Sequence, residues 1–244
     1  MRIKLCLAYD GTSFHGWQVQ DNAVTVQGTL LKALEKLYKK PVELHGCSRT
    51  DAGVHARSFI CHMDVDTFIP LDKLPIALNC LLPETVSVIS AEIVKDDFHS
   101  RYDVKNKTYR YYIRHSQLRD PFRADKCLFW NRPLDHKRFI EGCRYFIGKK
   151  DFAAFMAAGS NIRDTVRTVF DCRAFEDGED LVFSVTADGF LYNMVRIMVG
   201  TLIFINEKKL TPDSIPQIIA AKNRNLAGKT AEAHGLYLNK IFYE

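Results

Sequence analysis

Apolar and polar positions alternate with a period of two at the start of the chain, where residues 3, 5, 7 and 9 are apolar or aromatic. This period predicts a strand that ends at the Asp10-Gly11 turn. The spacing changes at Thr25, because apolar residues then recur at helical intervals up to Tyr38. It predicts a helix with Thr25 as its amino-terminal cap. The same two patterns predict strands over 59–65 and 85–94 and a short helix over 71–82.

The second half of the chain repeats this mixture of periods. It predicts a strand at 109–114 and a helix at 139–147. A hairpin of 169–175 and 181–186 follows, around the acidic turn 176–180. The last predicted elements are a buried helix at 190–205 and a helix capped by Thr211, with Pro212 at its first position. Mixed strands and helices, several of them joined by hairpins, indicate an α+β fold with a largely antiparallel sheet.

Composition places the chain among ordinary globular proteins of one large or two small domains: it has 244 residues, 47% hydrophobic and 26% charged. The uncharged apolar stretch 197–206 in the second half has 10 residues, far below the roughly 18 that suggest a membrane span. Arg2 and Lys4 interrupt any apolar signal core. Seven scattered cysteines lack CxxC spacing, and eight histidines lack an HExxH pair. We therefore expect a cytoplasmic protein with reduced thiols, no metal and no membrane contact.

The densest polar cluster of the sequence is the segment 45–56, in which small residues surround Arg49, Asp51 and His55. It lies between two predicted strands, and its small residues let the backbone approach a ligand closely. The cluster therefore predicts a binding or catalytic loop. An alternative is that Asp51 only organises its own turn, as aspartate often does next to glycine.

A single charge, Arg196, interrupts the apolar segment 191–200. If this helix is buried, the guanidinium needs a partner, because an unpaired charge removed from water costs several kcal/mol. The partner carboxylate has to come from elsewhere in the chain. The alternative is that Arg196 lies at a wet edge of the helix and extends its charged end into water.

The positive charge of the chain is concentrated in the basic run, residues 99–126. This run has eight lysines and arginines against three aspartates, an excess of +5 that equals the formal net charge of the whole chain. Aromatic residues are interleaved with the charges. Cations contact phosphates and aromatic faces stack on unpaired bases, so the mixture suits nucleic acid and RNA loops in particular. The alternative is a solvated basic edge strand whose tyrosines belong to the core.

A second acidic motif, Asp64-Val65-Asp66-Thr67, follows a predicted strand and is similar to the paired aspartates of aspartyl-phosphate hydrolases. In that chemistry one aspartate attacks phosphorus and the other handles the leaving group. The spacing disfavours this interpretation, because Phe68 occupies the position at which a hydroxyl belongs.

Motifs spread in order along nearly the whole chain resemble one known family. They are 9–20, 25–28, 48–56, 77–79 with 82–83, 98–101, 107–111, 151–152 with 155, 193–196 with 200, and 234–238. Each motif alone is weak evidence for a family, but so many motifs in the same order are specific evidence. The sequence is similar to the tRNA pseudouridine synthases of the TruA type.

The resemblance implies a pseudouridine synthase fold in which two α/β halves share a largely antiparallel mixed central sheet flanked by helices, with the active-site cleft between the halves. The first half, 1–100, would carry the catalytic aspartate loop, and the second, 101–244, the basic aromatic strand and the Arg196 helix. The implied activity is isomerisation of uridine to pseudouridine at positions 38, 39 and/or 40 in the anticodon stem-loop of tRNA. It also implies a cytoplasmic homodimer without cofactor or metal.

The resemblance also assigns roles to residues. Asp51 matches the nucleophilic aspartate, Arg49 the residue that helps evert the target base, Tyr109 the tyrosine that packs on the flipped uracil and takes part in proton transfer, and Arg196 the arginine paired with the aspartate. Further expected substrate-binding residues are Thr50, His55, Leu238, Arg101, Lys107 and Arg110. The alternative function is a non-catalytic tRNA-binding or chaperone module with the same fold. Two positions depart from the family pattern, since Ser48 stands where glycine is common and Glu232 where proline is usual.

Overall fold

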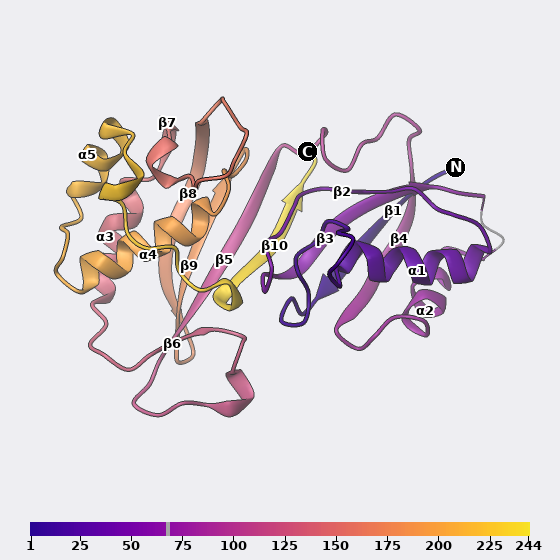
Figure 1. The fold of residues 1–244 in the computed structure, drawn as a ribbon, viewed down its shortest axis with the longest axis horizontal. Coiled ribbons are helices and arrows are strands. Elements are labelled where there is room, and N and C mark those ends of the chain that lie inside the picture. The colour runs from indigo at the N-terminus through magenta and orange to yellow at the C-terminus, as the bar shows by residue number, and fades with distance from the viewer. Residues whose placement is uncertain (67–68) are drawn as a thin grey trace. The chain divides into compact units, whose positions relative to one another are not determined.

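The computed structural model describes residues 1–66 and 69–244, and these form two compact units (Figure 1). The first unit contains Met1–Lys105 together with Tyr237–Glu244, and the second contains Asn106–Leu236. The last eight residues thus belong with the first unit, whereas the sequence placed the whole of 101–244 in one half. The reason is local, because the final strand pairs with a strand of the first unit.

The strands of the first unit lie in the order β4-β1-β3-β10, with β2 also paired to β3. Its strands are β1 (Arg2–Tyr9), β2 (Leu44–Gly46), β3 (His55–Asp64), β4 (Val86–Val94) and β10 (Leu236–Phe242). β1 runs antiparallel to both β3 and β4, and β10 runs parallel to β3. The alternation predicted for residues 3–9 is confirmed, since Ile3, Leu5 and Leu7 are fully buried.

Two helices complete the first unit, α1 (Val26–Tyr38) and α2 (Leu74–Asn79). The predicted cap of α1 is confirmed, because the Thr25 side chain accepts a hydrogen bond from the Gly28 N–H. Lys39, in the left-handed conformation, ends the helix. α2 is shorter than the predicted span 71–82 but buries Leu74 and Leu78 as an amphipathic helix would.

The strands of the second unit lie in the order β5-β9-β8-β7, with β6 paired in parallel to β5. Its strands are β5 (Asn106–His115), β6 (Leu128–Trp130), β7 (Gly148–Asp151), β8 (Val166–Asp177) and β9 (Asp180–Ala187). The predicted β8–β9 hairpin is confirmed, but its strands pair as far as Asp177 and Asp180. The turn therefore contains only Gly178 and Glu179, with Gly178 at φ 61° as a tight hairpin requires.

The helices of the second unit are α3 (His136–Arg144), α4 (Met194–Asn206) and α5 (Ser214–Ala221). α4 begins four residues later than predicted, because Asn193 adopts the left-handed conformation with φ 59°. The predicted start of the last helix at Pro212 is wrong. Thr211 and Pro212 belong to a preceding turn, in which the Thr211 N–H donates to the Ser214 hydroxyl.

Both units mix helices with strands whose pairs are mostly antiparallel, and the strands belong to one mixed sheet, which confirms the α+β class. Within the described ranges, no helix is long and apolar enough to cross a membrane. No three His, Cys, Asp or Glu side chains of those ranges are placed to hold a metal ion together.

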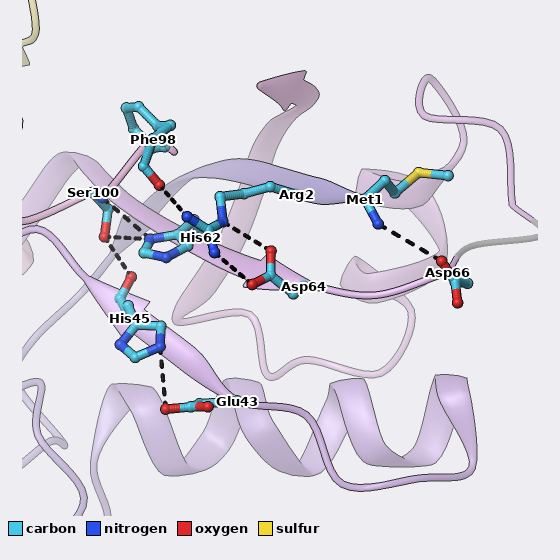
Figure 2. Close-up of polar contacts among 9 residues, drawn as sticks. All are labelled: Met1, Arg2, Glu43, His45, His62, Asp64, Asp66, Phe98 and Ser100. Carbon is cyan, nitrogen blue, oxygen red and sulfur yellow. Dashed lines mark hydrogen bonds and ion pairs between the residues drawn. The ribbon is translucent and has the colours of Figure 1, made fainter. Parts of the chain in front are cut away.

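Asp64 is held by an arginine in the first unit (Figure 2). The Arg2 guanidinium donates two hydrogen bonds to its carboxylate, at 2.8 Å and 2.6 Å, and holds the pKa of Asp64 below its usual value. Asp66 lies 3.7 Å from the Met1 amino group. Thr67 and Phe68, on which the phosphate-hydrolase interpretation also depends, lie outside the described residues. The contacts of Asp64 are those of a structural ion pair.

A buried histidine, His62, lies beside this ion pair and beneath Ser100 (Figure 2). Its Nδ1 accepts a hydrogen bond from the Ser100 N–H at 3.2 Å, and its ring stacks on His45 with 4.8 Å between centroids. Burial, with repulsion from His45 second, lowers the pKa of His62 from 6.5 to about 4. The neutral ring therefore belongs to the folded state.

This histidine makes stability depend on pH. Because the folded state binds the proton less readily than the unfolded chain, the stabilisation is complete above about pH 6.5 and is lost as the pH falls towards about 4. A shift of this size corresponds to about 3 kcal/mol. Urea unfolding at several pH values should show that His62→Gln loses less stability than the wild type over this window. Equal losses in the two proteins would contradict the assignment.

Candidate active site

Asp51 lies in the loop that joins β2 to β3, so the predicted loop between two strands is confirmed. The loop begins at Cys47, whose N–H donates to the Ile60 carbonyl at 2.8 Å. A tight turn follows Asp51, in which the Val54 N–H donates to the Asp51 carbonyl at 3.1 Å and Gly53 has φ 77°. The hydrogen bond that closes this turn is made by main-chain atoms.

Thr50 and His55, on either side of Asp51, are both buried. The Thr50 hydroxyl is hydrogen-bonded to the Tyr9 hydroxyl at 2.8 Å, and His55 Nδ1 accepts from the Gly11 N–H at 3.0 Å. Through these hydrogen bonds, both residues stabilise the conformation of the loop. Their direct contact with substrate stays a prediction.

The other expected residues of the first unit differ in exposure. Arg49 is exposed, whereas Leu238 is fully buried on β10 and pairs with Ala56 of β3. Next to Leu238, the Tyr237 ring stacks on His55 with 4.5 Å between centroids. β10 thus supports the strand that follows the Asp51 loop. The exposed guanidinium of Arg49 is accessible to an RNA substrate.

Tyr109 lies near the start of β5 in the second unit, where its backbone pairs with Val185 of β9. Its ring meets Phe190 edge to face, with 5.1 Å between centroids and an interplanar angle of 84°. Two residues along the strand, the buried Tyr111 donates a hydrogen bond to the Glu232 carbonyl at 2.9 Å. Burial raises the pKa of Tyr111 well above its usual value. The Tyr109 ring is therefore held in a fixed aromatic environment.

Arg196 lies in the first turn of α4, half-buried and held at two points. Its Nε donates to the Ala231 carbonyl and its Nη1 to the Asn193 side-chain oxygen, both at 2.7 Å. These two acceptors are neutral. The positive end of the helix dipole adds to the charge of the guanidinium, so the start of α4 is electrostatically suited to an anion.

Two glycines bring Ala231 close to this arginine. A Cβ atom on Gly200 of α4 would lie 1.6 Å from the Lys229 carbonyl oxygen, and one on Gly228 would lie 2.3 Å from Gly200. The Gly228 N–H also donates to the Thr201 hydroxyl at 2.9 Å. Only glycine permits this contact between α4 and the segment 228–231. The family motif that contains Gly200 thus serves the geometry of Arg196.

Sequence reasoning missed Asn193 as a residue of this site. It stands three positions before Arg196, which is a spacing that brings side chains together on a helix. Its left-handed backbone, with φ 59°, is a conformation that asparagine tolerates better than most residues. The spacing to Arg196 and the presence of asparagine can both be read from the motif 193–196.

The aromatic residues of the basic run divide between core and surface. On β5, Tyr109, Tyr111 and Tyr112 are buried, as the alternative predicted, but the strand itself is not an edge strand, because it pairs with both β6 and β9. Tyr102 and Phe122 are 75% and 92% exposed, as the nucleic-acid interpretation requires. Each interpretation therefore describes part of the run.

The cations of the basic run also differ, because some form ion pairs within the fold and others are exposed. Arg114 forms ion pairs with Glu179 and Asp180, and Arg123 with Asp180, so the β8–β9 turn neutralises two of them. Among the expected substrate-binding residues, Arg101 is exposed beside Tyr102, and Arg110 lies 5.8 Å from the Phe175 ring centre. Lys107 lies on β5 opposite Ala187. The basic surface is smaller than the charge of the run implies.

The two departures from the family pattern leave the backbone unstrained. Ser48 does not adopt a positive φ, so glycine is not required there. Glu232 has φ −58°, which lies within the range that a proline ring fixes. The chain thus takes the proline-like path before β10 without a proline.

Comparison with known proteins defines the class of this fold and site. Residues 5–103 and 143–244 match the family model described as tRNA pseudouridine synthase. The chain belongs to this family, which confirms the resemblance seen in the motifs.

The activity follows from the same comparison, since the matching proteins share one name. Proteins named tRNA pseudouridine synthase A from Thermoanaerobacter sp. strain X514 and Clostridium acetobutylicum are 44% and 40% identical, over 99% of this chain and 99% of their own lengths. That of Bacillus licheniformis is 42% identical over the full length of both. The protein is an isomerase that converts uridine in tRNA to pseudouridine.

A structural likeness is much weaker. A crystal structure of a Cbf5–Nop10–Gar1 complex aligns with a TM-score of 0.39 at 10% identity, over 96% of this chain and 57% of that chain.

Proposed function

We propose that the enzyme modifies positions 38, 39 and/or 40 in the anticodon stem-loop of tRNA, with Asp51 as the nucleophile acting on a flipped-out uridine. The observation that carries this proposal is the Arg49-Thr50-Asp51 segment, which matches the family's catalytic motif and lies in a loop fixed at both ends. A loop near the end of a stem is a favourable target, because a base is everted there at lower cost than inside a long duplex.

The chemistry needs few groups. Uracil must detach from the ribose through nitrogen, rotate while it is held, and reattach through carbon C5. Atoms and electrons are conserved within one nucleotide, so the overall reaction needs no redox partner. A carboxylate drives it by attacking the sugar or the ring, or by abstracting a ribose proton. Asp51 is the group that we assign to this step.

Arg196 and Tyr109 support the reaction in different ways. An ordinary carboxylate is already ionised at neutral pH, so an arginine paired with Asp51 acts by orienting it. The two neutral acceptors that hold Arg196 fix the direction of the guanidinium. The Tyr109 ring packs on the flipped uracil, retains it after detachment and takes part in proton transfer. Arg49 helps to evert the base.

The assembly that we propose is a cytoplasmic homodimer that binds the tRNA anticodon stem-loop. In a symmetric dimer each site draws basic surface from both subunits. A formal charge of +5 per chain is then sufficient to bind a polyanion.

Tritium release from tRNA labelled at uridine C5 tests this function, because C5 loses its hydrogen when it bonds to the ribose. We expect release that follows protein concentration and requires intact tRNA. A tRNA-binding or chaperone module would instead bind the same tRNA without releasing tritium. Binding without release would therefore contradict the proposal and support that alternative.

The basic run predicts how binding responds to salt. The tRNA dissociation constant should rise steeply with salt, because several phosphates are contacted. Replacing the exposed Arg101 by glutamine should reduce the slope of log affinity against log salt by about 1. Arg132→Gln is a matched control, since that exposed arginine is paired with Glu207. A salt titration with equal slopes for Arg101→Gln and wild type would exclude Arg101 as a phosphate contact.

A further inference from the structure

The motif at residues 9–20 has no role in the chemistry above, yet it lies along the Asp51 loop. Three hydrogen bonds donated by main-chain N–H groups join the two segments. The Trp17 N–H donates to the Thr50 carbonyl at 3.2 Å, the Gly53 N–H to the Phe14 carbonyl at 3.2 Å, and the Gly11 N–H to His55 Nδ1 at 3.0 Å. The first motif of the chain thus contacts the loop before, after and beyond Asp51.

Two glycines of this motif allow the backbones to touch. A Cβ atom on Gly16 would lie 2.3 Å from the Thr50 carbonyl oxygen, and Gly16 also has φ 83°. A Cβ atom on Gly11 would lie 2.1 Å from the Val54 carbonyl oxygen. Larger side chains at either position would displace the loop. The loop is therefore confined by main chain on this side.

One side-chain contact acts directly next to Asp51. The Tyr9 hydroxyl lies 2.8 Å from the Thr50 hydroxyl, and the two residues are only 5% and 7% exposed. Tyr9 belongs to β1, a strand paired on both sides, so it is a rigid anchor. A buried hydroxyl that loses its partner pays the full cost of desolvation, which favours the paired geometry strongly.

The second motif, 25–28, fixes the first one. The buried side chain of Gln27 donates to the Leu44 carbonyl at 3.0 Å and accepts from the Val19 N–H at 3.1 Å. Its backbone N–H donates to the Trp17 carbonyl at 3.0 Å. α1 therefore connects the segment 17–19 to the start of β2, the strand that leads into the Asp51 loop.

We propose that Tyr9 is a positioning residue, whose hydroxyl pairs with Thr50 and fixes the residue before Asp51 so that the carboxylate is presented in its reactive position. The inference rests on the proposed role of Asp51. A displacement of about 1 Å in a catalytic group costs about a hundredfold in rate. Substrate binding depends on many other contacts. Loss of the hydroxyl therefore slows the reaction without weakening the complex.

The test compares two tyrosines of the first unit that differ in the partner of their hydroxyl. Tyr9→Phe should lower the single-turnover rate of pseudouridine formation about 10- to 100-fold, with the tRNA dissociation constant within about twofold of wild type. Tyr38→Phe should change neither quantity by more than about twofold, because the buried Tyr38 hydroxyl has no hydrogen-bond partner among the described residues. A Tyr9→Phe rate equal to that of Tyr38→Phe, or a loss confined to binding, overturns the proposal.

Variants at Thr50 separate positioning from folding. Thr50→Val should lose as much rate as Tyr9→Phe, Thr50→Ser should recover most of it, and the double variant should lose no more than either single one. Additive losses overturn the pairing. If Tyr9→Phe does not fold, as judged by circular dichroism, the valine and serine variants carry the test alone.

Asp51→Asn, measured in parallel, distinguishes a failure of the proposed function from a failure of the positioning role of Tyr9. Wild-type turnover by Asp51→Asn overturns the proposed function together with this inference. An inactive Asp51→Asn beside a fully active Tyr9→Phe leaves the proposed function standing and overturns the inference alone.

Discussion

Asp51→Asn is expected to lower the rate of pseudouridine formation by at least about 10³-fold while the affinity for tRNA stays within about threefold of wild type. Asparagine has nearly the same shape, but its amide neither attacks carbon nor accepts a ribose proton as a carboxylate does. The loop itself should persist, since main-chain atoms close its turn and the Thr50 hydroxyl anchors it. Single-turnover kinetics with saturating enzyme measure the chemical step apart from binding.

A matched change elsewhere controls for the loss of one negative charge. Asp66→Asn removes a carboxylate that is almost fully exposed in the same unit, near the Met1 amino group. It should leave both rate and affinity unchanged. Turnover by Asp51→Asn at the level of Asp66→Asn would contradict the assignment of the nucleophile.

Arg196→Met is expected to cost about 10²-fold in the same rate, because in the proposed mechanism Arg196 orients the carboxylate. The measurement that identifies its partner is the double variant with Asp51→Asn. If Arg196 acts through Asp51, the double variant is no slower than Asp51→Asn alone. Independent roles would instead give losses that multiply.

Two further measurements make the Arg196 result specific. Arg132→Met removes an exposed arginine from the same unit and should keep full activity. Thermal unfolding checks the stability of Arg196→Met, since the Ala231 carbonyl and the Asn193 amide oxygen each lose a donor. An Arg196→Met enzyme that folds and keeps wild-type turnover is incompatible with the proposed role.

Periodicity predicted most of the longer elements, because burial of one face determines the spacing of apolar residues. It did not predict the strands β6, β7 and β10. It failed where single residues set the boundaries. Asn193 delays the start of α4 through its left-handed backbone, and Pro212 lies in a turn instead of at the first position of a helix. These conformations depend on local hydrogen bonds that a hydrophobic pattern does not contain.

The residue types of the candidate site were predictable from the sequence, but their supporting contacts were not. Asp51 and Arg196 stand out as charges among small or apolar neighbours. The bond between Tyr9 and Thr50 spans 41 residues, and that between Arg196 and Ala231 spans 35. Such pairs arise only when strands and helices are assembled, so no local pattern reveals them.

The charge of the basic run likewise could not be interpreted from the sequence alone. The net excess of the run 99–126 indicated a nucleic-acid surface, but part of it is neutralised within the fold. Arg114 and Arg123 are paired with the β8–β9 turn, which lies more than 50 residues further along the chain. The exposed cations, and not the summed charge, determine the salt dependence of binding.

The position of the modified nucleotide is the most direct test of the proposed function. Unmodified tRNA is incubated with the purified protein, and pseudouridine is mapped along its whole sequence. We expect pseudouridine at positions 38, 39 and/or 40 of the anticodon stem-loop, formed by the wild type and absent with Asp51→Asn. Pseudouridine confined to other positions, or none at any position, would contradict it.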